Sequence, residues 1–478
     1  MRSALLLLLF CAAACHQPWR NDPPPAASSV SVRIPAYEHR TLANGVQVYL
    51  QQDAYLPLVS VQLVVRAGEA AVAAPQAGLM QVLYEMLLDD PVLTRELDNR
   101  GASVQLGLRP DGAFIFANVA SADALPTLQL LAKALREPRL TADSFARVQA
   151  RRLATVFAQT PSPVQRAANA LLAAIYGPTH PMAVTGRKTL TPLSQLRLED
   201  VTDAYKRFIG PKNVAVVMTG RVPVVVGFAW AQKYLGDWAA EAEEPKVTQQ
   251  PVPESRKVVR LVPAAGLPGT LVLIGGRIDW KERGDEAAAR AAARFLATQI
   301  AVQLRLRGYA APGTETEVEL ESYAFGAHYV LRTFVRPEFT RIALKEIQEQ
   351  LAGKVAIHIS AKDSGESQLR QILFHLQLYL KLHESSKLTE ISALVHAFRG
   401  LTEIALNAAS LYVRQLPEVY YIRLLEGFNA LTAGQIDRGV ERYFAPAAAQ
   451  VVLAGDPALI ESQVRGAEFG TVQRLPPD

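Results

Sequence analysis

The chain has 478 residues, of which half are apolar and a fifth are charged. This is close to ordinary usage for a large globular protein, and the length exceeds what one hydrophobic core normally holds. We therefore expect two or more domains. The formal net charge of +5 is small for this size and gives no reason to expect a nucleic-acid partner.

The N-terminal residues resemble an export signal. Arg2 precedes an apolar run over residues 4–14, which is too short to span a membrane as a helix and is typical of a secretory signal. The run ends in Ala-Ala-Ala-Cys15, which resembles a bacterial lipoprotein signal with cleavage before Cys15 and lipid on its sulfur. Ala12 replaces the leucine usual at that place, so a plain secretory signal is the alternative.

We therefore predict a signal peptide over 1–14 and a lipidated tether over 15–31. Lipidation of Cys15 and loss of Cys11 with the signal would leave no thiol for a disulfide. The Pro- and Ser-bearing residues 21–29 have the composition of an extended tether. His16 and Gln17 follow the cysteine where an aspartate would retain the protein, which predicts the outer membrane, facing the periplasm.

A first folded unit is expected over residues 32–240. The Asn44-Gly45 pair predicts a hairpin turn between two strands within 37–50. Apolar residues at helical spacing predict a helix over 77–90 that is buried on most of its circumference. Further strands are expected at 58–65, 101–104 and 112–119, and further helices at 123–135 and 142–157.

The helix over 77–90 carries three polar exceptions, Gln81, Tyr84 and Glu85. Gln81 and Glu85 lie four residues apart on one face, where two metal-binding histidines sit in a zinc protease helix. The run Gly78–Leu87 resembles the active-site helix of the pitrilysin/insulinase family of zinc metallopeptidases, written G-L-x-H-x-x-E-H-M-L. An accidental likeness of an ordinary core helix is the alternative.

Other segments resemble the same family in the same order. They are Asn44-Gly45-Val46, the turn at Ala67-Gly68, Tyr176-Gly177 with His180-Pro181, and Tyr205 to Asn213 before a strand ending at Gly220. The resemblance implies that Gln81 and Glu85 stand at the positions of the two zinc histidines, and Tyr84 at that of the general-base glutamate.

These residues are poorly suited to zinc catalysis. Zinc needs about three imidazole, thiolate or carboxylate ligands and an open position for water. A Gln amide is a poor ligand, Tyr84 is normally protonated, and Glu85 would be alone. The resemblance places the third ligand near Ala154 and Thr155, and no carboxylate lies between Asp143 and Glu199. No two of the eight histidines have metal-site helical spacing. We therefore expect no catalytic residue, metal or cofactor at this helix.

The segment over 241–256 is charged and proline-bearing, which predicts a linker to a second unit over 257–478. That unit repeats the first: residues 267–275 match the strand after Leu56-Pro57, 286–296 match the helix, and 451–456 match the strand ending at Gly220. The expected fold class is α+β, with two similar domains, each an antiparallel-rich mixed sheet covered by helices (LuxS/MPP-like metallopeptidase fold), forming half of a clamshell.

The resemblance also implies an arginine and a tyrosine in the second domain that bind the substrate carbonyl. Arg305 and Tyr309 lie in the counterpart region, although their spacing is shorter than in the family. A helix end with a basic last turn explains them equally well. The helical region over 360–399, with His375 and His383, mixes basic and acidic residues, which favours a solvated face over one that binds anionic lipid.

The sequence thus predicts a membrane-tethered, non-catalytic peptidase homologue. It would pair with an active homologue bearing an intact HxxEH helix and enclose peptide or unfolded polypeptide in a shared chamber. A structural or binding lipoprotein in an envelope complex, without proteolysis, is the alternative from a different class. A peptidase with a rebuilt active site is a third.

Overall fold

The structure is a computed structural model. It describes residues 34–247, 258–280, 285–353, 365–447, 449–465 and 470–476, with the side chains of 365–372, 374 and 375 left out. The predicted signal peptide, the predicted tether and most of the predicted linker, including residues 248–256, lie outside the described residues. Residues 34–478 belong to one compact unit.

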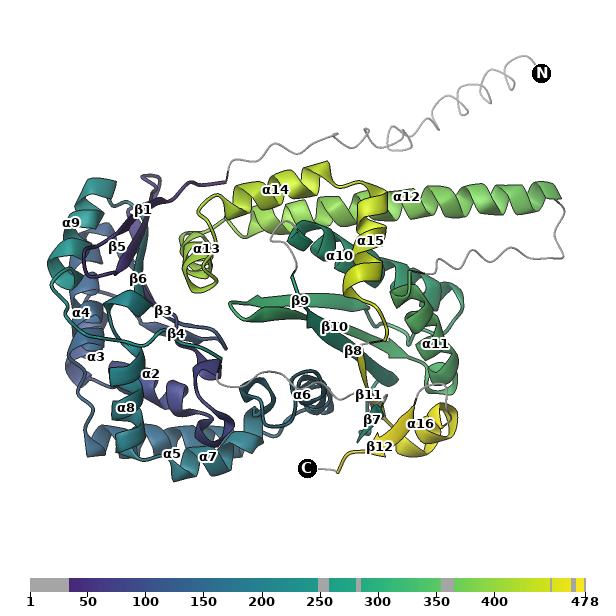
Figure 1. Cartoon of the computed structure of the whole chain (residues 1–478), viewed down its shortest axis with the longest axis horizontal. Coiled ribbons are helices and arrows are strands. Elements are labelled where there is room, and N and C mark those ends of the chain that lie inside the picture. Colours follow the sequence, from purple (N-terminus) through teal and green to yellow (C-terminus); the bar gives the residue numbers. More distant parts are fainter. Residues whose placement is uncertain are drawn as a thin grey trace, which may run out of the picture. The chain divides into compact units, whose positions relative to one another are not determined.

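The first half of the chain forms a six-stranded sheet in the order β1-β2-β6-β3-β5-β4 (Figure 1). Its strands are β1 (Glu38–Thr41), β2 (Gln47–Gln52), β3 (Leu58–Val65), β4 (Gln105–Leu108), β5 (Ala113–Ala120) and β6 (Val214–Gly220). Only the β2–β6 pair is parallel. The Asn44-Gly45 turn joins β1 to β2, and Gly45 adopts a φ of +99° that favours glycine.

One expected strand is wrong. Gly101 ends a turn, residues 102–104 have no regular secondary structure, and β4 begins only at Gln105. Gly101 has a φ of +63°, and the amide of Ala102 donates to Leu97 O, so this segment closes the preceding helix instead of pairing with β5.

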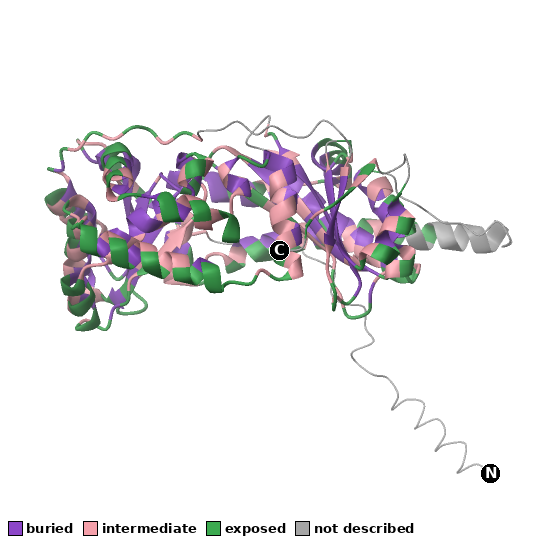
Figure 2. Ribbon diagram, turned by 90° about the horizontal axis from the view of Figure 1, so that it is seen from below, coloured by how far each residue is buried: buried purple, intermediate pink, exposed green. Residues whose placement is uncertain are grey.

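The first half of the chain has eight described helices. They are α2 (Leu79–Leu88), α3 (Pro91–Asp98), α4 (Ala124–Arg136), α5 (Ala142–Ala158), α6 (Pro163–Tyr176), α7 (Leu190–Gln195), α8 (Leu198–Phe208) and α9 (Val224–Leu235). Local sequence fixes several ends: Thr141 caps α5, and Ser162 and Gln165 form a capping box on α6. Figure 2 shows the strands largely buried, while the helices alternate buried and exposed faces.

The second half repeats this sheet. Its strands are β7 (Val258–Pro263), β8 (Thr270–Ile278), β9 (Glu317–Tyr323), β10 (Gly326–Val335), β11 (Gln450–Gly455) and β12 (Thr471–Arg474), in the order β12-β7-β11-β8-β10-β9. Five neighbouring strands correspond between the two sheets: β2-β6-β3-β5-β4 in the first matches β7-β11-β8-β10-β9 in the second. Within each set the strands come in the same order along the chain. This confirms the predicted α+β fold with two similar halves.

The helices of the second half are α10 (Asp285–Leu306), α11 (Thr340–Leu351), α12 (Gly365–His396), α13 (Leu401–Val413), α14 (Tyr420–Ala430), α15 (Ala433–Tyr443) and α16 (Pro457–Val464). Helix α10 runs ten residues past the expected end at Leu296, because good helix formers continue to Leu306. Within the described residues, no helix is both long and apolar enough to cross a membrane.

Each half covers the sheet of the other with one helix. Helix α6 packs on β7, β8 and β11 of the second sheet, and α13 packs on β3 and β6 of the first (Figure 1). Leu171 and Ile175 of α6 approach Gly275 so closely that a Cβ at this glycine would lie 3.0 Å from both side chains. This exchange joins the two halves through their cores.

Two hairpin turns add polar contacts between the halves. In the turn between β4 and β5, Asp111 accepts a hydrogen bond from the Ala324 amide at 2.9 Å, and Arg109 Nη2 donates to Ser322 O at 3.3 Å. Arg109 Nε also lies 3.5 Å from Asp111 Oδ1. The Asp111 side chain is only 2% exposed. Burial raises the pKa of this carboxyl group, partly offset by Arg109.

Asp111→Ala is expected to lower the free energy of unfolding by about 1 kcal/mol, because it removes the acceptor of the Ala324 amide. Asp111→Asn keeps an acceptor and is the matched control. Urea unfolding at neutral pH measures both. Equal stability of the Ala variant and the wild type would show that this contact does not hold the halves together.

The raised pKa of Asp111 also predicts a pH dependence. The native state holds the Asp111 proton more tightly than the unfolded state, so the stability it contributes is present below about pH 3.9 and is lost as the pH rises through the raised pKa. Relative to the wild type, Asp111→Asn should therefore gain stability as the pH rises from about 4 towards 7. The opposite trend in urea unfolding would mean that the Arg109 ion pair outweighs burial.

Candidate functional site

Helix α2 holds the residues that the sequence places at the zinc positions. It begins after Gly78, whose φ of +90° favours glycine, and packs against α5 and α8. Its apolar residues and Tyr84 are buried, whereas Gln81 and Glu85 are half-buried on the face towards α5. The helix is thus a core element of the first half, with one polar face.

Tyr84 is turned into the protein interior. It is fully buried, and its hydroxyl donates to Ala67 O at 2.6 Å, at the end of β3. Burial raises the pKa of Tyr84 well above its usual value. The side chain therefore stays protonated and cannot act as a general base in the place of the family's glutamate. It ties α2 to the first sheet.

Gln81 and Glu85 bind each other and α5. Gln81 Nε2 donates to Glu85 Oε1 at 2.7 Å. Arg152 Nε lies 3.4 Å from the same Glu85 oxygen, and Arg151 Nη2 lies 3.3 Å from Glu85 Oε2. Both carboxylate oxygens of Glu85 therefore face guanidinium groups from the helix that carries the third zinc ligand in the resembling family.

Asp89 extends this ion cluster by one helical turn. Its Oδ2 accepts from Arg147 Nη2 at 2.7 Å and from Ser144 Oγ at 2.8 Å, and its Oδ1 lies 3.6 Å from Arg151 Nη1. Three guanidinium groups thus surround two carboxylates. A divalent cation at Glu85 would meet this excess of positive charge, and the carboxylate would have to give up its arginine partners.

The third zinc position holds no carboxylate. Ala154 and Thr155 are exposed on α5, and the Thr155 hydroxyl donates to Arg151 O within its own helix. In the part of the chain that the structure describes, no group of three or more His, Cys, Asp or Glu side chains could hold a metal ion. His383 is buried with Nε2 2.8 Å from Asp437 Oδ1, and the His375 side chain lies outside the described residues.

Arg305 and Tyr309 lie away from α2. Arg305 is exposed in the last turn of α10, and the Tyr309 ring lies 5.1 Å from that of Phe339. Neither side chain lines the cavity that contains Arg66 and Asp111. The structure does not bring them together with Gln81 or Glu85, and a substrate-binding role for them stays a prediction.

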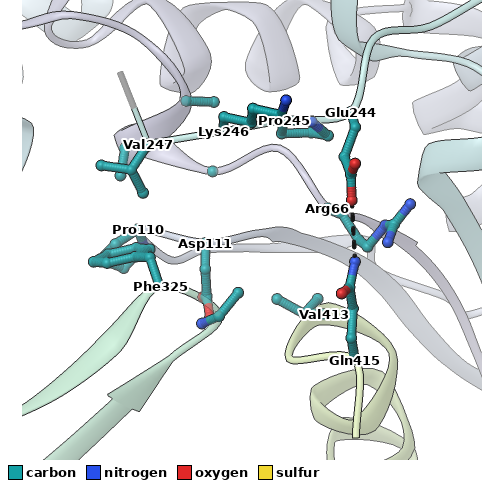
Figure 3. Close-up of a pocket in the computed structure, with 14 residues that line it drawn as sticks. Arg66, Pro110, Asp111, Glu244, Pro245, Lys246, Val247, Phe325, Val413 and Gln415 are labelled. Atoms are coloured by element: carbon teal, nitrogen blue, oxygen red, sulfur yellow. Dashed lines mark hydrogen bonds between the residues drawn. The ribbon is translucent and has the colours of Figure 1, made fainter. Parts of the chain in front are cut away.

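A cavity of about 510 Å³ lies between the two halves (Figure 3). The turn that carries Asp111, the turn at Phe325, the segment over 244–247 and the end of α13 line it. Arg66, Glu244 and Gln415 lie on one side, with Gln415 Nε2 3.4 Å from Glu244 Oε1, and Pro110, Val247 and Phe325 lie on the other.

Arg66, Asp111, Glu244 and Lys246 are the charged residues that line this cavity. Arg66 Nη2 donates to Lys212 O at 2.9 Å, and its guanidinium lies 5.3 Å from the centre of the Tyr412 ring. The sequence analysis does not predict Arg66 or Asp111 as site residues. The Pro110-Asp111-Gly112 run signals a turn, but no local pattern indicates that this turn reaches the other half of the chain.

Comparison with known proteins agrees with the resemblance. A family model described as the peptidase M16 inactive domain matches residues 195–363. No curated protein matches the chain in sequence.

Three solved structures share the fold. The peptidase M16 inactive domain from Pseudomonas fluorescens has a TM-score of 0.71 at 18% identity, over 88% of this chain and 98% of that one. A protease from Helicobacter pylori has a TM-score of 0.71 at 15% identity, over 88% and 100%.

The third is the periplasmic protease PqqL from Escherichia coli, with a TM-score of 0.68 at 15% identity. The match covers 91% of this chain but only 47% of PqqL. The family model over residues 195–363 and the shared two-sheet fold agree with the resemblance to the pitrilysin/insulinase peptidases, and they support an M16-type peptidase homologue that lacks the zinc site.

Proposed function

We propose that this protein is the non-catalytic partner of an active M16 peptidase. It would be anchored by lipid on Cys15 at the outer membrane and face the periplasm. It would contribute one half of a chamber around peptide or unfolded polypeptide, and an active zinc-peptidase homologue with an intact HxxEH helix would contribute the other half and the chemistry.

The ion cluster at Glu85 is the observation that carries the proposal. The polar face of α2 is paired with α5 through ion pairs: Glu85 and Asp89 pair with Arg147, Arg151 and Arg152. The same helix keeps its buried apolar residues and ties Tyr84 to β3. The scaffold around the former active site is thus maintained while its chemistry is replaced, which suits a subunit that shapes a chamber without cutting.

The comparison with PqqL supports a second subunit. This chain aligns with about half the length of that periplasmic protease. A partner chain of similar size would supply what the remaining half of PqqL supplies within one polypeptide. The periplasmic location of PqqL also agrees with the proposed location of this chain, on the periplasmic side of the outer membrane.

The purified chain alone is expected not to cleave unfolded peptides, because it offers neither zinc ligands nor a general base at α2. Fluorogenic peptides with and without chelator measure this. Glu85→Gln is the control for contamination: activity that persists in this variant comes from another protease. Chelator-sensitive cleavage that disappears with Glu85→Gln would contradict the proposal and support a rebuilt active site.

The partner is tested by gentle detergent purification of the full-length protein from its native membranes. We expect a stoichiometric M16 homologue with an intact HxxEH helix in the same particle. Recovery of unrelated envelope proteins alone would instead support the alternative, a structural or binding lipoprotein without proteolysis.

The tether is tested separately by mass spectrometry of the mature chain. We expect an N-terminal Cys15 that carries lipid, and release of the chain into the soluble periplasm when Cys15→Ser is introduced. A mature chain that begins elsewhere, without lipid, would contradict the tether and leave the partner experiment unaffected.

A further inference from the structure

One end of the first sheet exposes a group of large apolar side chains. Tyr55 is 89% exposed, Val225 is 75% exposed, and Leu56 and Leu58 are 47% and 41% exposed. We call these four residues the Tyr55 patch. Exposed apolar residues are ordinary when scattered, but a cluster at one place usually marks a contact surface.

The strand register brings these residues together. Gln52 at the end of β2 pairs with Gly220 at the end of β6, and the Asp53 amide donates to Gly220 O at 2.8 Å. The Arg221 amide donates to Leu58 O at 2.9 Å. The β2–β3 loop and the start of α9, which carries Val225, therefore leave the sheet side by side.

Hydrogen bonds hold the loop that presents Tyr55 and Leu56. The Tyr55 amide donates to Asp53 Oδ1 at 2.9 Å, and the Ser121 amide donates to Pro57 O at 2.9 Å. The loop backbone is thus anchored at both ends while its apolar side chains project outward. Because the backbone is ordered in advance, burial of these side chains by a partner would cost little conformational entropy.

The first described strand begins at the same end. Strand β1 is antiparallel to β2, and its first residue, Glu38, lies opposite Leu50, close to the point where β2 runs into the patch loop. A lipid on Cys15 would be joined to Glu38 by residues 16–37 alone. A chain anchored in this way would keep this end of the sheet within reach of the bilayer.

The charges near the patch argue against a purely electrostatic contact. Glu38, Asp53 and Arg221 belong to this end of the sheet, so it carries charges of both signs. A surface that bound anionic lipid by charge would need a cluster of Lys and Arg. A tyrosine beside two leucines is instead typical of side chains that enter the boundary between headgroups and acyl chains.

We propose that the Tyr55 patch docks the folded body onto the same bilayer that holds its lipid anchor. The inference rests on the proposed tether at Cys15, which selects a membrane as the occupant. Docking would fix the orientation of the first sheet against the membrane. Contact with lipid is apolar, so it changes little with ionic strength.

An environment-sensitive fluorophore on the full, lipid-anchored chain tests the proposal. The sequence has only Cys11 and Cys15, so Tyr55→Cys introduces a unique labelling site once Cys15 is lipidated. Phe157→Cys is the matched control, since Phe157 is an aromatic residue 67% exposed on α5. Both chains are reconstituted in phosphatidylcholine vesicles that contain brominated lipid.

We expect the probe at residue 55 to shift to the blue and to be quenched several-fold more than the probe at residue 157, equally at low and high salt. Adding Leu56→Ser and Val225→Ser to the labelled chain should reduce both signals towards those of the control. Because these side chains are exposed, urea unfolding should be unchanged, which separates docking from misfolding.

A probe at residue 55 that stays aqueous while the chain floats with the vesicles would overturn the proposal. A shift seen only in native membranes, and not in pure lipid, would also overturn it by identifying a protein as the occupant. If Cys15 carries no lipid, the tether proposal is wrong, and docking is then tested separately. The Tyr55→Cys chain, with Cys15→Ser to keep its label unique, is mixed with vesicles, and a blue shift of the probe fluorescence would show docking.

Discussion

Each half contributes one helix that packs on the sheet of the other half, and these two helices hold the halves together. Helix α6 packs into the core of the second sheet, and α13 covers β3 and β6 of the first. In each sheet, one face is covered by a helix from the other half. Opening the cavity between the halves would expose these apolar contacts, so the two sheets and the cavity form a single unit.

This packing explains how the fold can be stable without a zinc site. A catalytic zinc adds chemistry to a scaffold whose stability comes from packed cores, so its loss does not unfold the protein. Helix α2 still supplies Leu79, Leu83 and Leu87 to the core of the first half. The positions at which the resembling family carries its zinc residues serve packing in this chain: Tyr84 donates to Ala67 O, and Glu85 binds two arginines of α5.

The sequence predicts much of this fold because its signals are local. The Asn44-Gly45 turn, the period of α2, and the repeat of a strand, helix and glycine-ended strand in the second half depend on neighbouring residues. The strand expected at 101–104 fails because Gly101 closes α3. The exchange of α6 and α13, the Asp111 contact and the arginine partners of Glu85 depend on residues distant in the chain, and no local pattern encodes them. The substrate-binding role of Arg305 and Tyr309 stays a prediction.

We propose that chemistry and chamber are divided between two chains, and metal analysis of the native particle distinguishes this arrangement from a rebuilt active site. We expect one zinc per pair of chains, bound by the partner and absent from this chain after the two are separated. A zinc that stays with this chain and is lost on Glu85→Gln would contradict it.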